Sequence, residues 1–311
     1  MKIGIALGAG GAKAFAHIGI LKVLAQAGIE CDVVAGTSMG SLVGAVYASG
    51  NIQKLGEAAS KIKLSDIPGL LGPMWPNQGL CDGRGFLKHL NEIIEVENIE
   101  DLQKPFAAVC VDLNKSEMFT FTKGVVCQAV QSSMAIPAIF APVIFEDKLL
   151  VDGGVLEPIP VQAARSLGAD FVIAVDLLTN CVSCFTDSDS QAVKSEVQES
   201  LLLPPVIVSI LDGLNSILKK LSLKKEDGLE EKYILQQLGI LNIVRRTSEL
   251  TQMGLMKYRL KEYPADFVIS PKLAHVGLLD LHRAKEAIEG GEQATKAVLP
   301  ELLKLIKKKG S

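Results

Sequence analysis

Residues 33–48 read VVAGTSMGSLVGAVYA, and the change of pattern inside this stretch decides the fold class. Residues 33–35 are an apolar run that predicts a buried strand, and a helix is predicted over about 38–49. The sequence GTSMG, from Gly36 to Gly40, lies where the strand gives way to the helix. A serine at such a turn presents its hydroxyl, because flanking glycines have no Cβ to clash. Ser38 is therefore a candidate nucleophile, although a serine that caps a glycine-rich helix start would look similar.

The sequence on either side of residues 33–48 shows the same alternation of predicted strand and helix. An apolar strand is predicted at 3–7 and a helix at about 12–27. Helical crossovers between buried strands imply a parallel sheet with right-handed connections. The fold class that we expect is α/β, a three-layer sandwich with a central, mostly parallel sheet. Further strands are predicted at 143–145, 149–151, 171–176 and 267–270, a hairpin at 106–113 with 117–122, and a helix at about 125–134.

The second half of the chain contains a helix-rich stretch at about 179–264 that interrupts this alternation. We expect one catalytic domain over 1–311, with its sheet core at 1–178 and 265–311 and with 179–264 as an insertion. Residues 206–221 place apolar side chains on one helical stripe, which suits either core packing or an apolar lid. A last helical pattern, 281–309, is interrupted by Gly290-Gly291 and by Pro300.

Composition limits the possible function classes. Lys and Arg number 32 against 35 Asp and Glu, and aromatic residues are 5% of the chain. This balance gives no support for phosphate neutralisation or base stacking, so no nucleic-acid partner is expected. Hydrophobic residues make up 48%, which is ample for a large core.

Cysteine usage and hydropathy indicate the compartment. The 6 cysteines lie mostly in apolar text and predict buried thiols in a reduced compartment. Cys181 and Cys184 form a CxxC without a second ligand pair nearby, so no zinc site is expected. The apolar run at the N-terminus is too short for the hydrophobic region of a secretory signal. The sequence also has no run of about 18 apolar residues, so no transmembrane helix is predicted. We expect a cytoplasmic protein, with peripheral contact at the inner membrane face left open.

A glycine-rich loop, GAGGAK, follows the first predicted strand. A phosphate-binding P-loop is disfavoured because Ala12 and Ala14 stand where it needs Gly and Ser or Thr. A dinucleotide fingerprint is disfavoured because Lys13 stands at its third glycine. The remaining interpretation is a nest of backbone N–H groups for the oxyanion of an acyl intermediate. The candidate oxyanion-hole residues are Gly8, Gly10, Gly11, Ala12 and Met39.

A serine nucleophile needs a base. The four histidines are His17, His89, His275 and His282, and each suits a structural or surface role better. Asp152 ends the apolar run LLVD and precedes Gly153-Gly154, so the carboxylate is held where the chain turns sharply away. Asp112 and Asp176 also end strands but lack the glycine pair.

These segments together resemble the patatin-like phospholipase family. The resemblance covers most of the chain and includes the segments LGAGGAKAFAHIGILKVLAQAGI, GTSMGSLVGAVYASG, SSMAIPAIFAPV and LLVDGGVLEPIPV. It implies a Ser–Asp dyad, with Ser38 as nucleophile and Asp152 as base, and an oxyanion nest that includes Gly10, Gly11 and Ala12. It also implies activity without a metal or other cofactor. The chain departs from many relatives at Ala9, Lys13 and Ala14, where Gly, Arg and Gly are common.

The resemblance implies a serine hydrolase that cleaves acyl esters of phospholipids, lysophospholipids or related lipids. A non-catalytic regulator or scaffold with the same fold remains the alternative, because a fold does not determine a function. An NAD(P)-binding enzyme is a third hypothesis, which a cofactor-dependent rise in melting temperature would support. The head group, the acyl chain length and the oligomeric state stay open.

Overall fold

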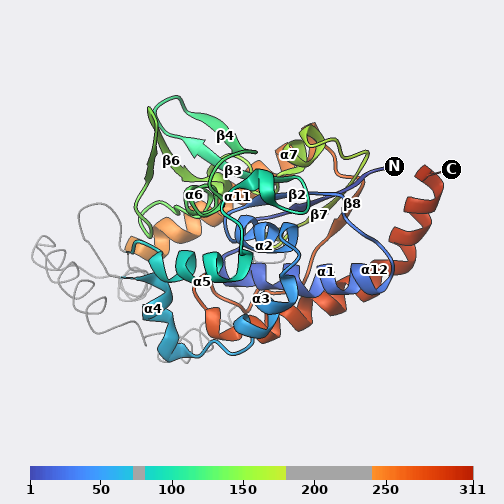
Figure 1. The fold of residues 1–311 in the computed structure, drawn as a ribbon, viewed down its shortest axis with the longest axis horizontal. Helices are drawn as coiled ribbons and strands as arrows, with labels where there is room; N and C mark the ends of the chain where they lie inside the picture. The colour runs from blue at the N-terminus through green and yellow to red at the C-terminus, as the bar shows by residue number, and fades with distance from the viewer. Residues whose placement is uncertain (73–80, 180–239, 311) are drawn as a thin grey trace, which may run out of the picture. The chain divides into compact units, whose positions relative to one another are not determined.

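The computed structural model describes residues 1–72, 81–179 and 240–310 (Figure 1). The chain divides into two compact units, one formed by Met1–Val182 with Gln252–Ser311 and the other by Ser183–Thr251. Most of the predicted insertion, with its 206–221 helix and its CxxC, lies outside the described residues; the described part of it is mainly helix α11 (Ile240–Glu262). None of the helices in the described ranges is both long enough and apolar enough to cross a lipid bilayer.

The first unit is built on one sheet, which has 8 strands among the described residues. Its order is β5-β6-β3-β2-β1-β7-β8, with β4 also paired to β3. Strands β3, β2, β1, β7 and β8 run parallel, whereas β4, β5 and β6 form antiparallel pairs at one end. The α/β class and the predicted hairpin are thereby confirmed. The strands are β1 (Ile3–Leu7), β2 (Val33–Thr37), β3 (Phe106–Asp112), β4 (Glu117–Phe121), β5 (Val143–Phe145), β6 (Lys148–Asp152), β7 (Phe171–Val175) and β8 (Phe267–Ile269).

Alternation along the strands produces two cores, one on each face of the sheet. In β1, Ile5 and Leu7 belong to the larger core and Ala6 to the smaller one. The larger core is covered by α1 (Ala16–Gln26), α2 (Met39–Ala48), α3 (Ile52–Ala59), α4 (Ile67–Leu71), α5 (Arg84–Ile94), α6 (Val126–Ser133) and α12 (Ala284–Gly310). The other face is covered by α7 (Val161–Ser166) and by the part of α11 that belongs to the same unit, through Met253, Met256 and Leu260, which completes three layers (Figure 1).

Two predicted helices differ from the structure. The stretch predicted as one helix at 12–27 begins as a 3-10 helix, Gly11–Phe15, and becomes α-helical only at Ala16. Helix α12 is continuous, so the predicted interruptions at Gly290-Gly291 and Pro300 are wrong. A Cβ on Gly291 would lie 2.1 Å from Ala16 O, so this glycine lets α12 pack tightly on α1. Burial of the apolar face of α12 outweighs the weak helix propensity of Gly and Pro.

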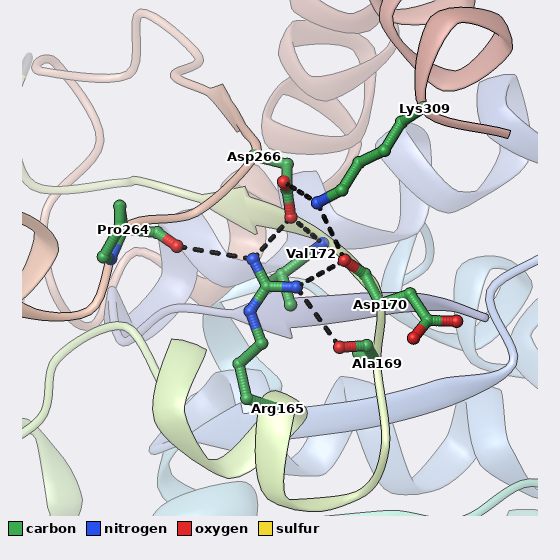
Figure 2. A network of polar contacts seen from close by, with 7 residues as sticks. All are labelled: Arg165, Ala169, Asp170, Val172, Pro264, Asp266 and Lys309. Atoms are coloured by element: carbon green, nitrogen blue, oxygen red, sulfur yellow. Dashed lines mark hydrogen bonds and ion pairs between the residues drawn. The ribbon is translucent and has the colours of Figure 1, made fainter. Parts of the chain in front are cut away.

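The last turn of α12 is tied to the edge of the sheet through Asp266, just before β8 (Figure 2). Asp266 accepts hydrogen bonds from Arg165 Nη2 at 2.5 Å, from Val172 N at 2.7 Å and from Lys309 Nζ. Burial opposes ionisation of this carboxyl, but the bonds from Lys309, Val172 and Arg165 outweigh it and hold the pKa of Asp266 below its usual value. The network fixes α7, β7, β8 and the end of α12 together.

Candidate active site

Ser38 lies on the sharp turn between β2 and α2. Its backbone adopts φ 59° and ψ −134°, a left-handed conformation that costs about 1–3 kcal/mol for a residue with a Cβ. The surroundings hold it there, since a Cβ on Gly36 would lie 2.4 Å from Ser41 Cα and one on Gly40 would lie 2.2 Å from Leu7 O. Both motif glycines are therefore required by the close approach of backbone, and the turn aims the serine above the sheet.

The hydroxyl of Ser38 meets the carboxylate of Asp152. Ser38 Oγ donates a hydrogen bond to Asp152 Oδ2 at 2.5 Å, and each residue is only 3% exposed. Asp152 ends β6, where it pairs with Cys110 of β3. Its second oxygen, Oδ1, accepts a bond from Gly154 N at 2.7 Å, which fixes the rotamer. The two residues are 114 positions apart in the chain, and the structure brings them into direct contact.

The environment of Asp152 alters its acidity. Burial raises the pKa of this carboxyl from 3.8 to about 6, against the lowering effect of the bonds from Ser38 and Gly154. A carboxylate with a pKa near 6 is a better proton acceptor than a solvated aspartate and is still ionised at neutral pH. The pair can therefore transfer a proton from the serine hydroxyl to the carboxylate.

The glycine-rich loop provides backbone donors beside Ser38's turn. Among the described residues, no acceptor is present for the N–H groups of Gly10, Gly11 or Met39. Gly11 adopts φ 55°, and a Cβ there would lie 2.4 Å from Leu278 O, so only glycine fits. The structure differs from the prediction at Ala12, whose N–H donates to Leu278 O at 2.9 Å and is not available to an oxyanion. The carbonyl of Gly8, by contrast, accepts a bond from His17 Nε2 at 2.8 Å.

Ser133 supports the turn and was missed from the sequence as an individual residue. Its Oγ accepts a hydrogen bond from Ser38 N at 2.9 Å and donates one to Val109 O at 2.6 Å. Because Ser38 N–H is occupied in this way, Met39 is the first residue of the turn with a free N–H. Ser133 lies within SSMAIPAIFAPV, but no spacing rule connects that stretch with residue 38.

The segment that follows Asp152 joins the other two parts of the site. Gly153 begins a short 3-10 helix, and its Cβ, if present, would lie 2.3 Å from Val109 O. Further along, Glu157 O accepts a bond from Thr37 Oγ1 at 3.0 Å, and Pro158 O accepts one from Ala9 N at 2.8 Å. The base segment is thus bonded both to the serine turn and to the glycine-rich loop, which fixes their relative positions.

A buried ion pair lies behind the same segment. Arg259 Nη2 on α11 lies 3.5 Å from Glu157 Oε1 and donates a hydrogen bond to Gln162 Oε1 at 2.8 Å. Glu157 is 3% exposed, and its burial raises the pKa of the carboxyl despite the opposing charge of Arg259. Neither residue could be assigned from the sequence, since about a hundred positions separate them and no motif includes Arg259.

His17, His275 and the two rival acids have other partners. Nε2 of His17 bonds to Gly8 O, and burial lowers the pKa of His17 to about 4, so the ring is neutral at neutral pH. His275 Nε2 lies 2.6 Å from Glu286 Oε1, in an exposed pair. Asp112 and Asp176 accept bonds from the backbone N–H groups of the turns that follow them. In the described structure, no hydrogen bond joins a histidine to the dyad.

An α/β sheet that carries a serine on a strand-to-helix turn, bonded to a carboxylate, is typical of serine acyl hydrolases. The model of the patatin-like phospholipase family matches residues 5–165, and the chain belongs to that family. Membership indicates lipid acyl hydrolase activity.

Several relatives share extended similarity. An uncharacterized NTE family protein of Mycobacterium tuberculosis is 28% identical over 329 residues, which covers 96% of this chain and 91% of that protein. Patatin-like phospholipase domain-containing protein 7 of Rattus norvegicus and protein 6 of Homo sapiens are each 33% identical over 181 residues. That match covers 56% of this chain and 13% of each of those proteins. A solved structure, VipD from Legionella pneumophila, covers 96% of this chain and 66% of its own at 15% identity and a TM-score of 0.46, too distant to inform the site.

Proposed function

We propose that the protein is a metal-independent serine hydrolase that cleaves acyl esters of phospholipids or lysophospholipids through a Ser38–Asp152 dyad. The observation that carries this proposal is the 2.5 Å hydrogen bond between Ser38 Oγ and Asp152 Oδ2 in a buried site. The class that we propose is a carboxylic ester hydrolase of phospholipase A, lysophospholipase or esterase type, and membership of the patatin-like phospholipase family supports it.

In the proposed reaction, Ser38 Oγ attacks the ester carbonyl while its proton passes to Asp152 Oδ2. The carbonyl oxygen becomes an oxyanion, which the N–H groups of Gly10, Gly11 and Met39 stabilise. Collapse of this intermediate breaks the ester bond, and Asp152 returns the proton to the leaving alcohol. Water then attacks the acyl-enzyme with Asp152 again as base, which releases the fatty acid and restores Ser38.

The direct test combines hydrolysis and covalent labelling. Wild type is expected to hydrolyse a p-nitrophenyl acyl ester and to be labelled by a fluorophosphonate at Ser38, as located by mass spectrometry of the digested protein. Ser38→Ala is expected to lose both, because the substitution removes the oxygen that attacks the ester and the fluorophosphonate. Full activity in this variant would contradict the dyad, and an unlabelled Ser38 in wild type would favour the non-catalytic regulator.

The pH dependence should follow the base. Asp152 accepts a proton only when ionised, and burial raises its pKa to about 6. We therefore expect kcat/KM to be constant above about pH 7 and to fall tenfold per pH unit below pH 6. His17 stays mainly neutral above about pH 5 and does not titrate near pH 6, because burial lowers its pKa to about 4. Initial rates with a soluble ester between about pH 4 and 8 test this, and a flat profile across pH 6 would argue against Asp152 as base.

A lipid substrate also requires contact with a lipid phase. Cosedimentation of the full chain with anionic liposomes tests peripheral membrane contact separately from ester cleavage. If the protein cleaved a soluble ester but did not cosediment with the liposomes, the result would support the hydrolase activity and contradict the membrane contact.

A further inference from the structure

Helices α2, α3, α4 and α5 lie on the larger-core face of the sheet (Figure 1). Residues of these helices line an apolar cavity of about 250 Å³. The buried side chains that line it include Phe15, Met39, Leu42, Leu55 and Phe86, none more than 8% exposed. Their character suits a hydrocarbon ligand, because these buried apolar side chains offer no hydrogen-bond partners to water.

The cavity adjoins the serine turn through Met39. Met39 directly follows Ser38 and lines the cavity, while its N–H is a proposed oxyanion donor. Phe15 also lines the cavity and is the last residue of the 3-10 helix that begins at Gly11. The serine turn and the helix that carries Gly11 thus each contribute a residue to one apolar wall.

Part of the wall reaches the protein surface. Lys61, Asp66 and His89 line the cavity and are exposed, as is Ala58 on α3. The cavity therefore has buried apolar lining residues, Met39 among them, and an exposed rim that contains polar side chains. A chain attached to Ser38 through its carbonyl could extend along Leu42 toward Ala58.

On the basis of the proposed function, we infer that this cavity holds the unbranched acyl chain of the ester being cleaved and accommodates about ten of its carbons. The length follows from volume, since a cavity of about 150 Å³ accommodates the six carbons of benzene. Each methylene that enters should raise kcat/KM about fourfold through burial of apolar area. Carbons beyond about the tenth pass the exposed rim and gain nothing further.

The test measures kcat/KM of the full-length protein for p-nitrophenyl esters from acetate to tetradecanoate, each below the concentration at which it aggregates. For wild type we expect a steep rise that levels off at about ten carbons. Ala58→Phe places a ring at an exposed lining position, so the profile should level off at shorter chains. The ratio of kcat/KM for decanoate to that for acetate should fall at least about tenfold.

Gln53→Phe is the matched control, because Gln53 is also exposed on α3 but does not line the cavity. Its chain-length profile should equal that of wild type. Ser38-dependent hydrolysis that does not vary with chain length, or equal ratios in Ala58→Phe and Gln53→Phe, would overturn the acyl-chain assignment alone. The absence of Ser38-dependent hydrolysis for every ester would overturn the proposed function and this inference with it.

Discussion

Asp152→Asn is expected to lower kcat for a soluble acyl ester by about 10⁴-fold, close to the loss caused by Ser38→Ala. The asparagine amide has nearly the same shape as the carboxylate, but it cannot accept the proton of Ser38 Oγ. Because the two residues act as one unit, the double variant should be no less active than either single variant. Steady-state rates for the three variants, measured with one ester, test this. Retention of more than about a tenth of wild-type kcat would show that the base lies elsewhere.

Stability measurements separate this loss from unfolding. The pKa of Asp152 is raised to about 6 by burial, so the folded state resists ionisation of this carboxyl. The resulting cost to folding is present above pH 6 and absent below about pH 4, and it amounts to about 3 kcal/mol at neutral pH. Asp152→Asn removes it, so the variant should melt at a higher temperature than wild type at pH 7 and at a similar one near pH 4. A lower melting temperature at pH 7 would contradict the assigned environment.

Gly40→Ala is expected to destabilise the fold by about 3 kcal/mol or more, enough to lower the melting temperature by roughly 6–12 °C. The added Cβ would lie 2.2 Å from Leu7 O and 2.7 Å from Gly8 O. Both neighbours are backbone atoms at the end of β1, so neither can rotate away, and α2 must shift instead. Thermal unfolding followed by circular dichroism measures the change.

Gly254→Ala provides the matched control, since it makes the same change inside a helix. No atom lies within 4 Å of the Cβ that it would add on α11. Alanine is also the better helix former, so this variant should melt at or slightly above the wild-type temperature. If Gly40→Ala also melted within about 2 °C of wild type, the close contact between α2 and β1 would be wrong.

The strands were predictable because a short apolar run bounded by Gly, Pro or polar turn residues leaves a local signal. Residues 171–175 and 267–269 follow this rule, and the hairpin of β3 and β4 was evident from its turn. Helix α12 was not predictable in its full length. Its glycines disfavour a helix locally. The need for a glycine at position 291 becomes clear only from the close packing of α1 against α12 at that residue.

The candidate site divides in the same way. The sequence by itself determined which residues are candidates for the chemistry, since Ser38, Asp152 and the glycine-rich loop each stand at a strand end with their own local pattern. Only the tertiary structure decided which of them meet. In the structure, Asp152 rather than Asp112 or Asp176 accepts the hydrogen bond of Ser38 Oγ. The N–H of Ala12 donates to Leu278 O, and Ser133 Oγ accepts a hydrogen bond from Ser38 N. Hydrogen bonds and cavities depend on distances between segments far apart in the chain, and no local pattern of side chains encodes those distances.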